Sequence, residues 1–401
     1  KPPMTESLQS ILVLLPAPVL VAVVSRSLKL PPLLGYLVVG VAIGPHALGL
    51  IPDSPESRVL GEFGVVFLMF SIGLQFSLPK LVAMRRTVFG LGTLQVGITL
   101  AVFTLVLPLL LPIEWRAGVL LGGAAAMSST AIVIKMLADR LELDTPHGRQ
   151  IVGVLLFQDL AVVPLLILVP TLAQAAGDLG WAVLLAVVKA AVVLSVLLVF
   201  GQRPMRAWFN LVARRYSSEL FILNVLLITL GLAYITHAAG LSLALGAFVA
   251  GMLISETEYR YQVEDDIKPF RDVLLGLFFV TVGMQLDVHE VIADFGWVLA
   301  ALAGFVVFKA ALIAGLSRLF GNSKGAALRM GLDLAHIGEF AFVLLALPGA
   351  AALVPEPLMQ PVLAAMLLSM LIAPFVIEYS ERIVRRTIGA EWLNRAMELH
   401  Q

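Results

Sequence analysis

Long apolar stretches follow one another along almost the whole chain, separated by short segments rich in charged and turn-forming residues. A helix needs about 20 apolar residues to cross the hydrocarbon core of a bilayer. The pattern predicts thirteen spans, at residues 8–25, 33–51, 62–78, 88–111, 117–137, 151–174, 181–201, 219–236, 241–254, 271–286, 295–317, 326–348 and 357–378. We therefore expect an all-α polytopic membrane protein with thirteen transmembrane helices.

Lysine and arginine alternate between crowded and nearly empty connections along this series of spans. The connections after odd-numbered spans, such as residues 203–215, hold most of the 27 basic residues. Because cytoplasmic loops carry the excess of positive charge, this asymmetry predicts an N-terminus outside and a C-terminus in the cytoplasm. Composition agrees with a membrane location, since 60% of the residues are hydrophobic and only 13% are charged, against about 25% in soluble domains. The zero net charge does not suggest nucleic acid as a partner, and the absence of cysteine excludes thiolate metal sites.

Two short motifs recur at nearly the same offset in the two halves of the chain. Gly35–Gly40 matches Gly246–Gly251, and Phe70–Gln75 matches Val280–Gln285. Each pair lies seven spans apart, an odd number, so the copies face opposite ways. This is the pattern of inverted-topology repeats, here spans 1–6 and 8–13, with span 7 as the linker. Generic packing of small residues between helices is the alternative explanation.

Spans 5 and 12 correspond in such a repeat, and both collect small and polar residues at mid-depth. Span 5 contains Ser128, Ser129 and Thr130, and span 12 contains the segment Asp333–Glu339. Helices of this kind can break and leave half-helix ends that coordinate ions. The hydroxyls could instead bond to the preceding turn of a continuous helix.

Asp159 is the most informative single residue, because it lies inside the uncharged run from Ile151 to Leu172. An ionised aspartate at bilayer depth costs at least ~2.5 kcal/mol, so such residues usually mark an ion or proton site. Lys309, in span 11, pairs with Asp159 in one hypothesis and forms a structural salt bridge with Glu339 or Asp333 in the other. We expect Glu339 to be an anchor beside the site or an accessory proton carrier, and Asp333 to be solvated near the cytoplasmic end of its span.

The stretch Gly153–Pro164, with Gln158 before Asp159, resembles the Kef-type monovalent cation/proton antiporter family, which is related to bacterial sodium/proton exchangers. Five further stretches support the resemblance, at residues 34–45, 127–133, 245–252, 277–284 and 338–343. It implies a homodimer in the bacterial inner (plasma) membrane and crossed discontinuous helices. It also implies a scaffold domain at 8–80 and 219–286 and an ion-transporting core at 87–174 and 294–378, with 181–201 as the linker helix.

The same resemblance assigns transport roles to individual residues. Asp159 would bind cation and proton in turn, with Lys309 facing it and Glu339 nearby. Gln158 stands where electrogenic exchangers carry a second aspartate. The hydroxyl residues Ser128, Ser129 and Thr130 lie at the crossover. Together with Asp159, these four residues form the expected cation site.

Two departures from the Kef pattern limit what can be carried over. We expect 379–401 to be a cytoplasmic C-terminal helix, with the nucleotide-binding regulatory domain of Kef-type proteins missing from this chain. The segment Tyr259–Asp266 resembles their acidic regulatory loop but has Tyr261 in place of its usual histidine, so glutathione gating is not expected.

We predict a secondary transporter, not an enzyme, that needs no cofactor and moves K⁺ or Na⁺ against H⁺. One carboxylate can hold a cation or a proton but not usefully both, which favours electroneutral K⁺/H⁺ exchange by alternating access. The alternatives are a Na⁺/H⁺ antiporter and a ligand-gated K⁺ channel, although no filter-like repeat of the kind that channels use is present. An intramembrane hydrolase lacks its G-x-S-x-G motif.

Overall fold

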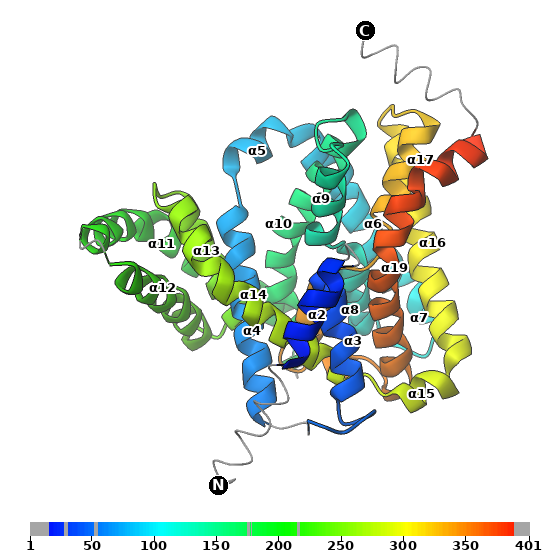
Figure 1. The fold of residues 1–401 in the computed structure, drawn as a ribbon, viewed down its shortest axis with the longest axis horizontal. Helices are drawn as coiled ribbons and strands as arrows, with labels where there is room; N and C mark the ends of the chain where they lie inside the picture. The colour runs from blue at the N-terminus through cyan, green and yellow to red at the C-terminus, as the bar shows by residue number, and fades with distance from the viewer. Residues whose placement is uncertain are drawn as a thin grey trace. The chain divides into compact units, whose positions relative to one another are not determined.

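The computed structural model describes residues 16–27, 31–51, 55–174, 177, 179–214 and 217–388. Every regular element among them is helical (Figure 1). The chain forms two compact units, each built from two separate stretches of sequence. Unit 1 comprises residues 1–78 and 166–289, and unit 2 comprises residues 79–165 and 290–401, so the boundary falls inside one long helix.

Unit 1 contains seven helices along the described chain. They are α2 (Pro16–Ser27), α3 (Pro32–Ile43), α4 (Pro55–Gln75), α11 (Leu179–Ala213), α12 (Ser218–Ala238), α13 (Leu243–Ser255) and α14 (Arg260–Met284).

Unit 2 contains the remaining helices of the described chain. They are α5 (Leu78–Ala83), the π-helix η1 (Thr87–Gly92), α6 (Thr93–Leu105), α7 (Leu107–Leu110), α8 (Trp115–Ala126), α9 (Thr130–Asp139), α10 (Pro146–Gln174), α15 (Val288–Ala293), α16 (Phe295–Leu319), α17 (Lys324–Asp333), α18 (Phe340–Leu345), the 3₁₀-helix η2 (Ala351–Leu353) and α19 (Glu356–Ile388). Three of the helices, α5, α10 and α15, extend across a unit boundary.

Within the described residues, each of the thirteen predicted stretches corresponds to one helix or to a series of consecutive helices, so the all-helical prediction is confirmed; residues 8–15 of the first stretch lie outside the described part. Seven helical segments of the described chain are long and apolar enough to cross a membrane, two of them (Thr87–Leu110 and Trp115–Asp139) made of consecutive helices, and three shorter apolar helices accompany them. The linker helix is longer than predicted, since α11 continues to Ala213. Residues 379–388 continue α19 and do not form a separate helix, and residues 389–401 lie outside the described part. The scaffold and transport roles of the predicted domains stay predictions.

The repeat predicted from sequence reappears as paired helix contacts in unit 1. A Cβ on Gly40 of α3 would lie 2.1 Å from the Val280 carbonyl oxygen of α14, far closer than real Cβ atoms come. Its counterpart Gly251 of α13 stands in the same relation to Phe70 of α4, at 2.2 Å. Only glycine permits such close approach of two helix backbones. The packing of α3 on α14 thus repeats the packing of α13 on α4.

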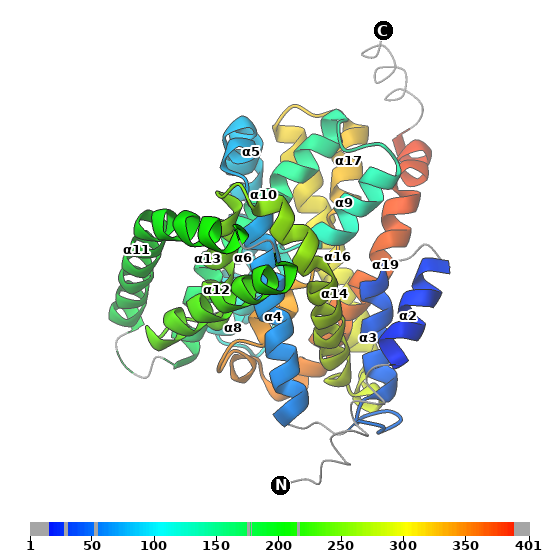
Figure 2. The ribbon, with the colours of Figure 1, turned by 60° about the vertical axis from the view of Figure 1, so that its left-hand side comes forward.

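A second set of glycines obeys the same correspondence. A Cβ on Gly73 of α4 would lie 2.1 Å from the Phe248 carbonyl oxygen, and one on Gly283 of α14 would lie 2.3 Å from the Leu37 carbonyl oxygen. Figure 2 shows α4 and α14 side by side in the middle of this group. The four close contacts form two pairs, and exchanging the two repeats converts one member of each pair into the other. Generic packing of small residues is therefore a poor explanation for the sequence match.

Two helices of unit 2 are interrupted where the sequence collects its small and polar residues. The first break separates α8 from α9 at residues 127–129, and the second separates α17 from α18 at residues 334–339. The Gly338 amide donates to the Met127 carbonyl oxygen at 3.1 Å, so the two interrupted segments cross each other. The predicted crossed discontinuous helices are therefore present, and the continuous-helix alternative is wrong.

Candidate cation site

The crossing of the two breaks is held by hydrogen bonds between groups that a continuous helix would have used internally. Ser128 Oγ donates to the Leu334 carbonyl oxygen at 2.9 Å. Ser129 is the N-cap of α9, where its hydroxyl accepts from the Ile132 amide at 3.2 Å. Both serines are buried. Ser128 joins the two interrupted segments and Ser129 caps α9, and among the described residues neither hydroxyl forms a hydrogen bond to Asp159.

Lys309 of α16 binds both interrupted segments at once. Its Nζ donates to the Met127 carbonyl oxygen at 2.7 Å and to the His336 carbonyl oxygen at 2.9 Å, and the side chain is 1% exposed. Among the described residues it forms no ion pair with a carboxylate, so the predicted salt bridges to Asp159, Glu339 or Asp333 are wrong. Sequence alone carries no information on helix rotation, and the carbonyls freed at the breaks are the nearer acceptors.

His336 contributes its ring to the same crossing. Its Nε2 accepts a hydrogen bond from the Ser129 amide at 2.9 Å. An N–H group can only donate, so Nε2 carries no proton and the ring is the neutral tautomer with its proton on Nδ1. Nδ1 is buried and finds no hydrogen-bond partner within the described chain. The ring holds the N-terminal end of α9, a structural role.

Gln158 is also engaged on both sides of its carboxamide. Its Oε1 accepts from the Ser128 amide at 2.7 Å, and its Nε2 donates to Gln95 Oε1 at 2.8 Å. Gln95 lies on α6 and is fully buried. Sequence analysis missed Gln95, although an amide inside the apolar span 88–111 was a signal that could have drawn attention to it.

Asp159 lies one residue further along α10 and is half-buried. Thr130 Oγ1 donates to Asp159 Oδ1 at 3.3 Å. Thr130 is the first residue of α9 and is half-buried as well, so the carboxylate lies near the N-terminal end of that helix, whose dipole favours negative charge. Of the three hydroxyl residues predicted at the crossover, only Thr130 contacts the carboxylate.

Glu339 follows the second break and is 4% exposed. It is close enough to interact electrostatically with Asp159, and its Oε2 has no hydrogen-bond partner among the described residues. No group of three or more His, Asp or Glu side chains with metal-binding spacing occurs in the described part of the chain. Asp159 and Thr130 thus form a small oxygen-rich site next to the crossing, with the Glu339 carboxyl within electrostatic range of Asp159.

Asp333 does not lie in solvent as predicted; it is completely buried at the last position of α17. Its Oδ2 lies 3.9 Å from Arg329 Nε, and Arg329 Nη2 binds Glu142 Oε2 at 2.5 Å. Arg140 lies 3.3 Å from both Glu142 and Glu381. The prediction is wrong because Arg329, one turn earlier on α17, and tertiary packing enclose a position that the sequence pattern places near the end of its span.

Glu142 lies in the connection between α9 and α10, where its neighbours decide its ionisation. Burial raises the pKa of its carboxyl, but hydrogen bonds from His147 and Arg329 and the charges of Arg329 and Arg140 outweigh burial and lower the pKa to about 2. Glu142 is therefore ionised at every physiological pH.

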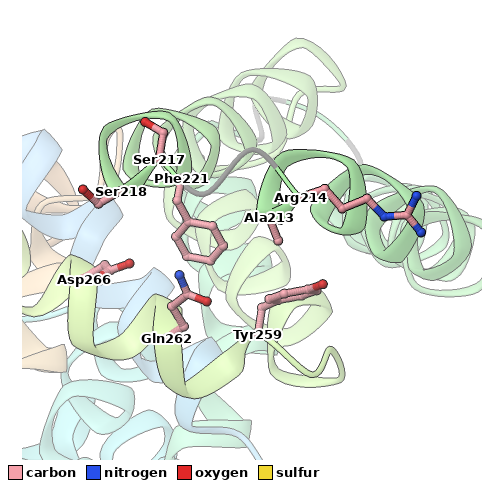
Figure 3. Close-up of a pocket in the computed structure, with 8 residues that line it drawn as sticks. All are labelled: Ala213, Arg214, Ser217, Ser218, Phe221, Tyr259, Gln262 and Asp266. Atoms are coloured by element: carbon pink, nitrogen blue, oxygen red, sulfur yellow. The ribbon is translucent and has the colours of Figure 1, made fainter.

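Unit 1 has a hollow of about 570 Å³ (Figure 3). Side chains of Phe221, Tyr259 and Gln262 converge on it, while the guanidinium of Arg214 points to one side. The segment predicted as an acidic loop contributes to its wall, yet from Arg260 onward that segment is the first part of α14. None of the predicted cation-site residues lines this hollow, and all of them belong to unit 2.

Residues 11–379 match the model of a family described as sodium/hydrogen exchanger, transmembrane. The chain belongs to the sodium/hydrogen exchanger family. Its fold is also similar to that of the sodium proton antiporter MjNhaP1 from Methanocaldococcus jannaschii, with a TM-score of 0.71 and 16% identity over 96% of this chain and 100% of that one.

Three further relatives share more of this chain's sequence. K(+) efflux antiporter 1, chloroplastic, from Arabidopsis thaliana is 42% identical over 367 residues, which is 88% of this chain and 30% of that protein. Its paralogue K(+) efflux antiporter 2 is 41% identical over the same length, 31% of its own chain. A protein of Alkalimonas amylolytica named for K(+) efflux antiport, KefB, is 40% identical over 377 residues, 92% of this chain and 55% of that one. The chain thus spans about a third to a half of these relatives.

Proposed function

We propose that this exchanger is a transporter, not an enzyme, and that it moves K⁺ against H⁺ across a membrane. Asp159 carries the proposal, because it is a half-buried carboxyl within a membrane-spanning helix, beside the N-terminal end of an interrupted helix. It binds a proton or a cation in turn. Thr130 Oγ1, which donates to the carboxylate, offers its oxygen to a cation when its hydroxyl turns away.

One negative charge at this position supports electroneutral exchange. Gln158 brings no charge next to Asp159, so the bound forms of the site with K⁺ or with H⁺ both have zero net charge. Glu339 contributes a second carboxyl close by, and we propose that it stays protonated through the cycle. If Asp159 and Glu339 were both ionised, the two carboxylates would repel each other in a medium of low dielectric.

K⁺ is favoured over Na⁺ because the three relatives are named for K⁺ efflux. Na⁺ stays the second candidate, since the fold is shared with a sodium proton antiporter. A hydroxyl and a carboxylate are hard oxygen ligands that can serve either ion.

We also propose an arrangement in the membrane. The distribution of lysine and arginine supports an N-terminus outside and a cytoplasmic C-terminus in a bacterial inner membrane. The family resemblance supports a homodimer. In this proposal unit 1 is the scaffold and unit 2 the mobile carrier of ions.

Cation-dependent proton movement in proteoliposomes tests the function. K⁺ and Na⁺ are added separately, with and without valinomycin to set the membrane potential, to wild type and to Asp159→Asn. We expect proton movement on K⁺ addition that is independent of potential and absent in Asp159→Asn. Potential-dependent K⁺ flux without proton movement would show a channel, and retained exchange in Asp159→Asn would refute the role of Asp159.

A further inference from the structure

Three hydrogen bonds form a continuous chain beside the first helix break. Gln95 Nε2 donates to the Ala126 carbonyl oxygen at 3.1 Å, at the end of α8. Gln158 Nε2 donates to Gln95 Oε1 at 2.8 Å, and Gln158 Oε1 accepts from the Ser128 amide at 2.7 Å, just before α9 begins. Both glutamines are at most 1% exposed. Two side chains from other helices therefore connect one side of the break to the other.

The two backbone groups at the ends of this series of hydrogen bonds determine which partner donates in each of them. The Ala126 carbonyl can only accept and the Ser128 amide can only donate, so each carboxamide has one orientation that satisfies all partners. A carboxylate at position 158 would place an acceptor against Gln95 Oε1. If Gln95 then turned over, its oxygen would face the Ala126 carbonyl. The three hydrogen bonds are all made only when position 158 carries a neutral group with one donor and one acceptor, as its glutamine does.

We propose that Gln95 is a positioning residue that holds Gln158 as a neutral clamp on the break between α8 and α9. Both polar atoms of Gln158 are engaged in the clamp, and the proposal gives Gln158 this positioning role in place of the expected role as a cation ligand. The clamp fixes the start of α9, and with it Thr130, relative to Asp159. It also keeps position 158 uncharged, which leaves Asp159 as the ionised carboxylate that the exchange uses. This inference rests on the proposed antiport for its effect on transport.

A glutamic acid at position 95 provides the sharpest test. Its protonated form has one O–H donor and one carbonyl acceptor, and can replace the amide in the chain, whereas its ionised form can only accept. Gln95→Glu should therefore behave like wild type at acidic pH and lose the clamp as pH rises. Gln95→Met should lack the clamp at every pH.

The experiment uses the full chain, purified in detergent for thermal unfolding and reconstituted for K⁺/H⁺ exchange, from acidic to alkaline pH. The matched control is Thr99→Val, a buried hydroxyl one turn away on α6 that donates to the Gln95 backbone carbonyl oxygen and is outside the chain. We expect the unfolding temperature of Gln95→Glu, relative to wild type, to fall with rising pH. Its apparent KM for K⁺ should rise about three- to tenfold over the same range, the worth of one hydrogen bond. Gln95→Met should show the raised KM throughout, and Thr99→Val neither effect.

If the unfolding temperature of Gln95→Glu differs from that of wild type by the same amount at every pH, the proposed clamp is refuted, whatever the protein transports. The pH-dependent unfolding difference with an unchanged KM would overturn the positioning role. If wild type exchanges and Asp159→Asn does not, either result leaves the proposed antiport standing. If wild type shows no exchange, the antiport fails together with the positioning role, and the unfolding measurement still decides the clamp.

Discussion

The two units bury different kinds of side chain, although both derive from the same inverted repeat. Among the described residues, every buried charged side chain and the buried histidine belong to unit 2: Lys309, Arg329, Asp333, Glu339 and His336. The buried polar residues of unit 1 are uncharged, and its helices meet through glycines whose Cα atoms lie against the carbonyls of their neighbours.

The difference follows from how the helices are built. In unit 1 the helices at the repeat contacts are continuous, so their backbones are satisfied internally and can pack closely without polar partners. In unit 2 two helices are interrupted, and the freed carbonyls and amides must be bound by side chains such as Lys309, His336 and Gln158. Buried charge thus distinguishes unit 2, which carries the ions in the proposed function. Close glycine contacts occur in both units, since a Cβ on Gly118 of α8 would lie 2.4 Å from the Phe103 carbonyl oxygen of α6.

The largest effect should come from breaking the ion pairs of unit 2. Arg329→Met leaves Glu142 and Asp333 without their shared cation, at a cost of about 3–5 kcal/mol of unfolding free energy. The matched change in unit 1, Arg206→Met, removes an exposed side chain that donates to the Glu256 carbonyl oxygen, and should cost less than about 0.5 kcal/mol. Thermal unfolding in detergent measures both. Equal losses in the two variants would contradict the comparison, and Glu142→Gln added to Arg329→Met should restore part of the stability.

A smaller loss is expected when the lysine at the crossing is removed. Lys309→Met leaves the His336 carbonyl without its donor and takes one of two donors from the Met127 carbonyl, at about 2–4 kcal/mol. Lys189→Met, an exposed lysine on α11 of unit 1, should change the unfolding temperature little. A tolerated Lys309→Met would show that the crossing does not depend on this side chain.

Adding one methyl group tests the packing of unit 1. Gly40→Ala forces α3 away from α14 and should cost about 1–3 kcal/mol, and Gly251→Ala should cost a similar amount because it occupies the equivalent contact. Gly231→Ala on α12 has no atom near the new methyl group and should be neutral or slightly stabilising. Unequal effects of Gly40→Ala and Gly251→Ala, judged by unfolding temperature, would weaken the assigned repeat.

The smallest effect is the pH dependence that Glu142 confers on unit 2. Its pKa in the folded protein, about 2, lies below the ordinary value of 4.5, so its contribution to stability is complete above that value and is lost as pH falls toward 2. Wild type should be more stable than Glu142→Gln at pH 6, and the difference in their unfolding free energies should be smaller by about 1–2 kcal/mol at pH 3. A gap that stays constant with pH would contradict the assignment.

The spans, the repeat and the two breaks could be predicted from sequence because each leaves a local signal: apolar length, paired glycines, or small polar residues at mid-depth. The hydrogen-bond partners of the buried polar groups could not be predicted from sequence. Lys309 and Asp159 are both charged and lie in spans of one proposed core, yet helix rotation and the acceptors at the breaks determine that the lysine binds carbonyls. Gln95 shows the same limit, since only the fold brings its amide to Gln158.

The central claim is that Asp159 exchanges one proton for one cation. The most direct test is proton release when K⁺ is added to purified protein in weakly buffered detergent solution near the pH where exchange begins. We predict release of about one proton per K⁺ bound, as a single shared carboxylate requires, and no release from Asp159→Asn. Equal release from wild type and Asp159→Asn, or K⁺ binding to wild type without proton release, would contradict the account.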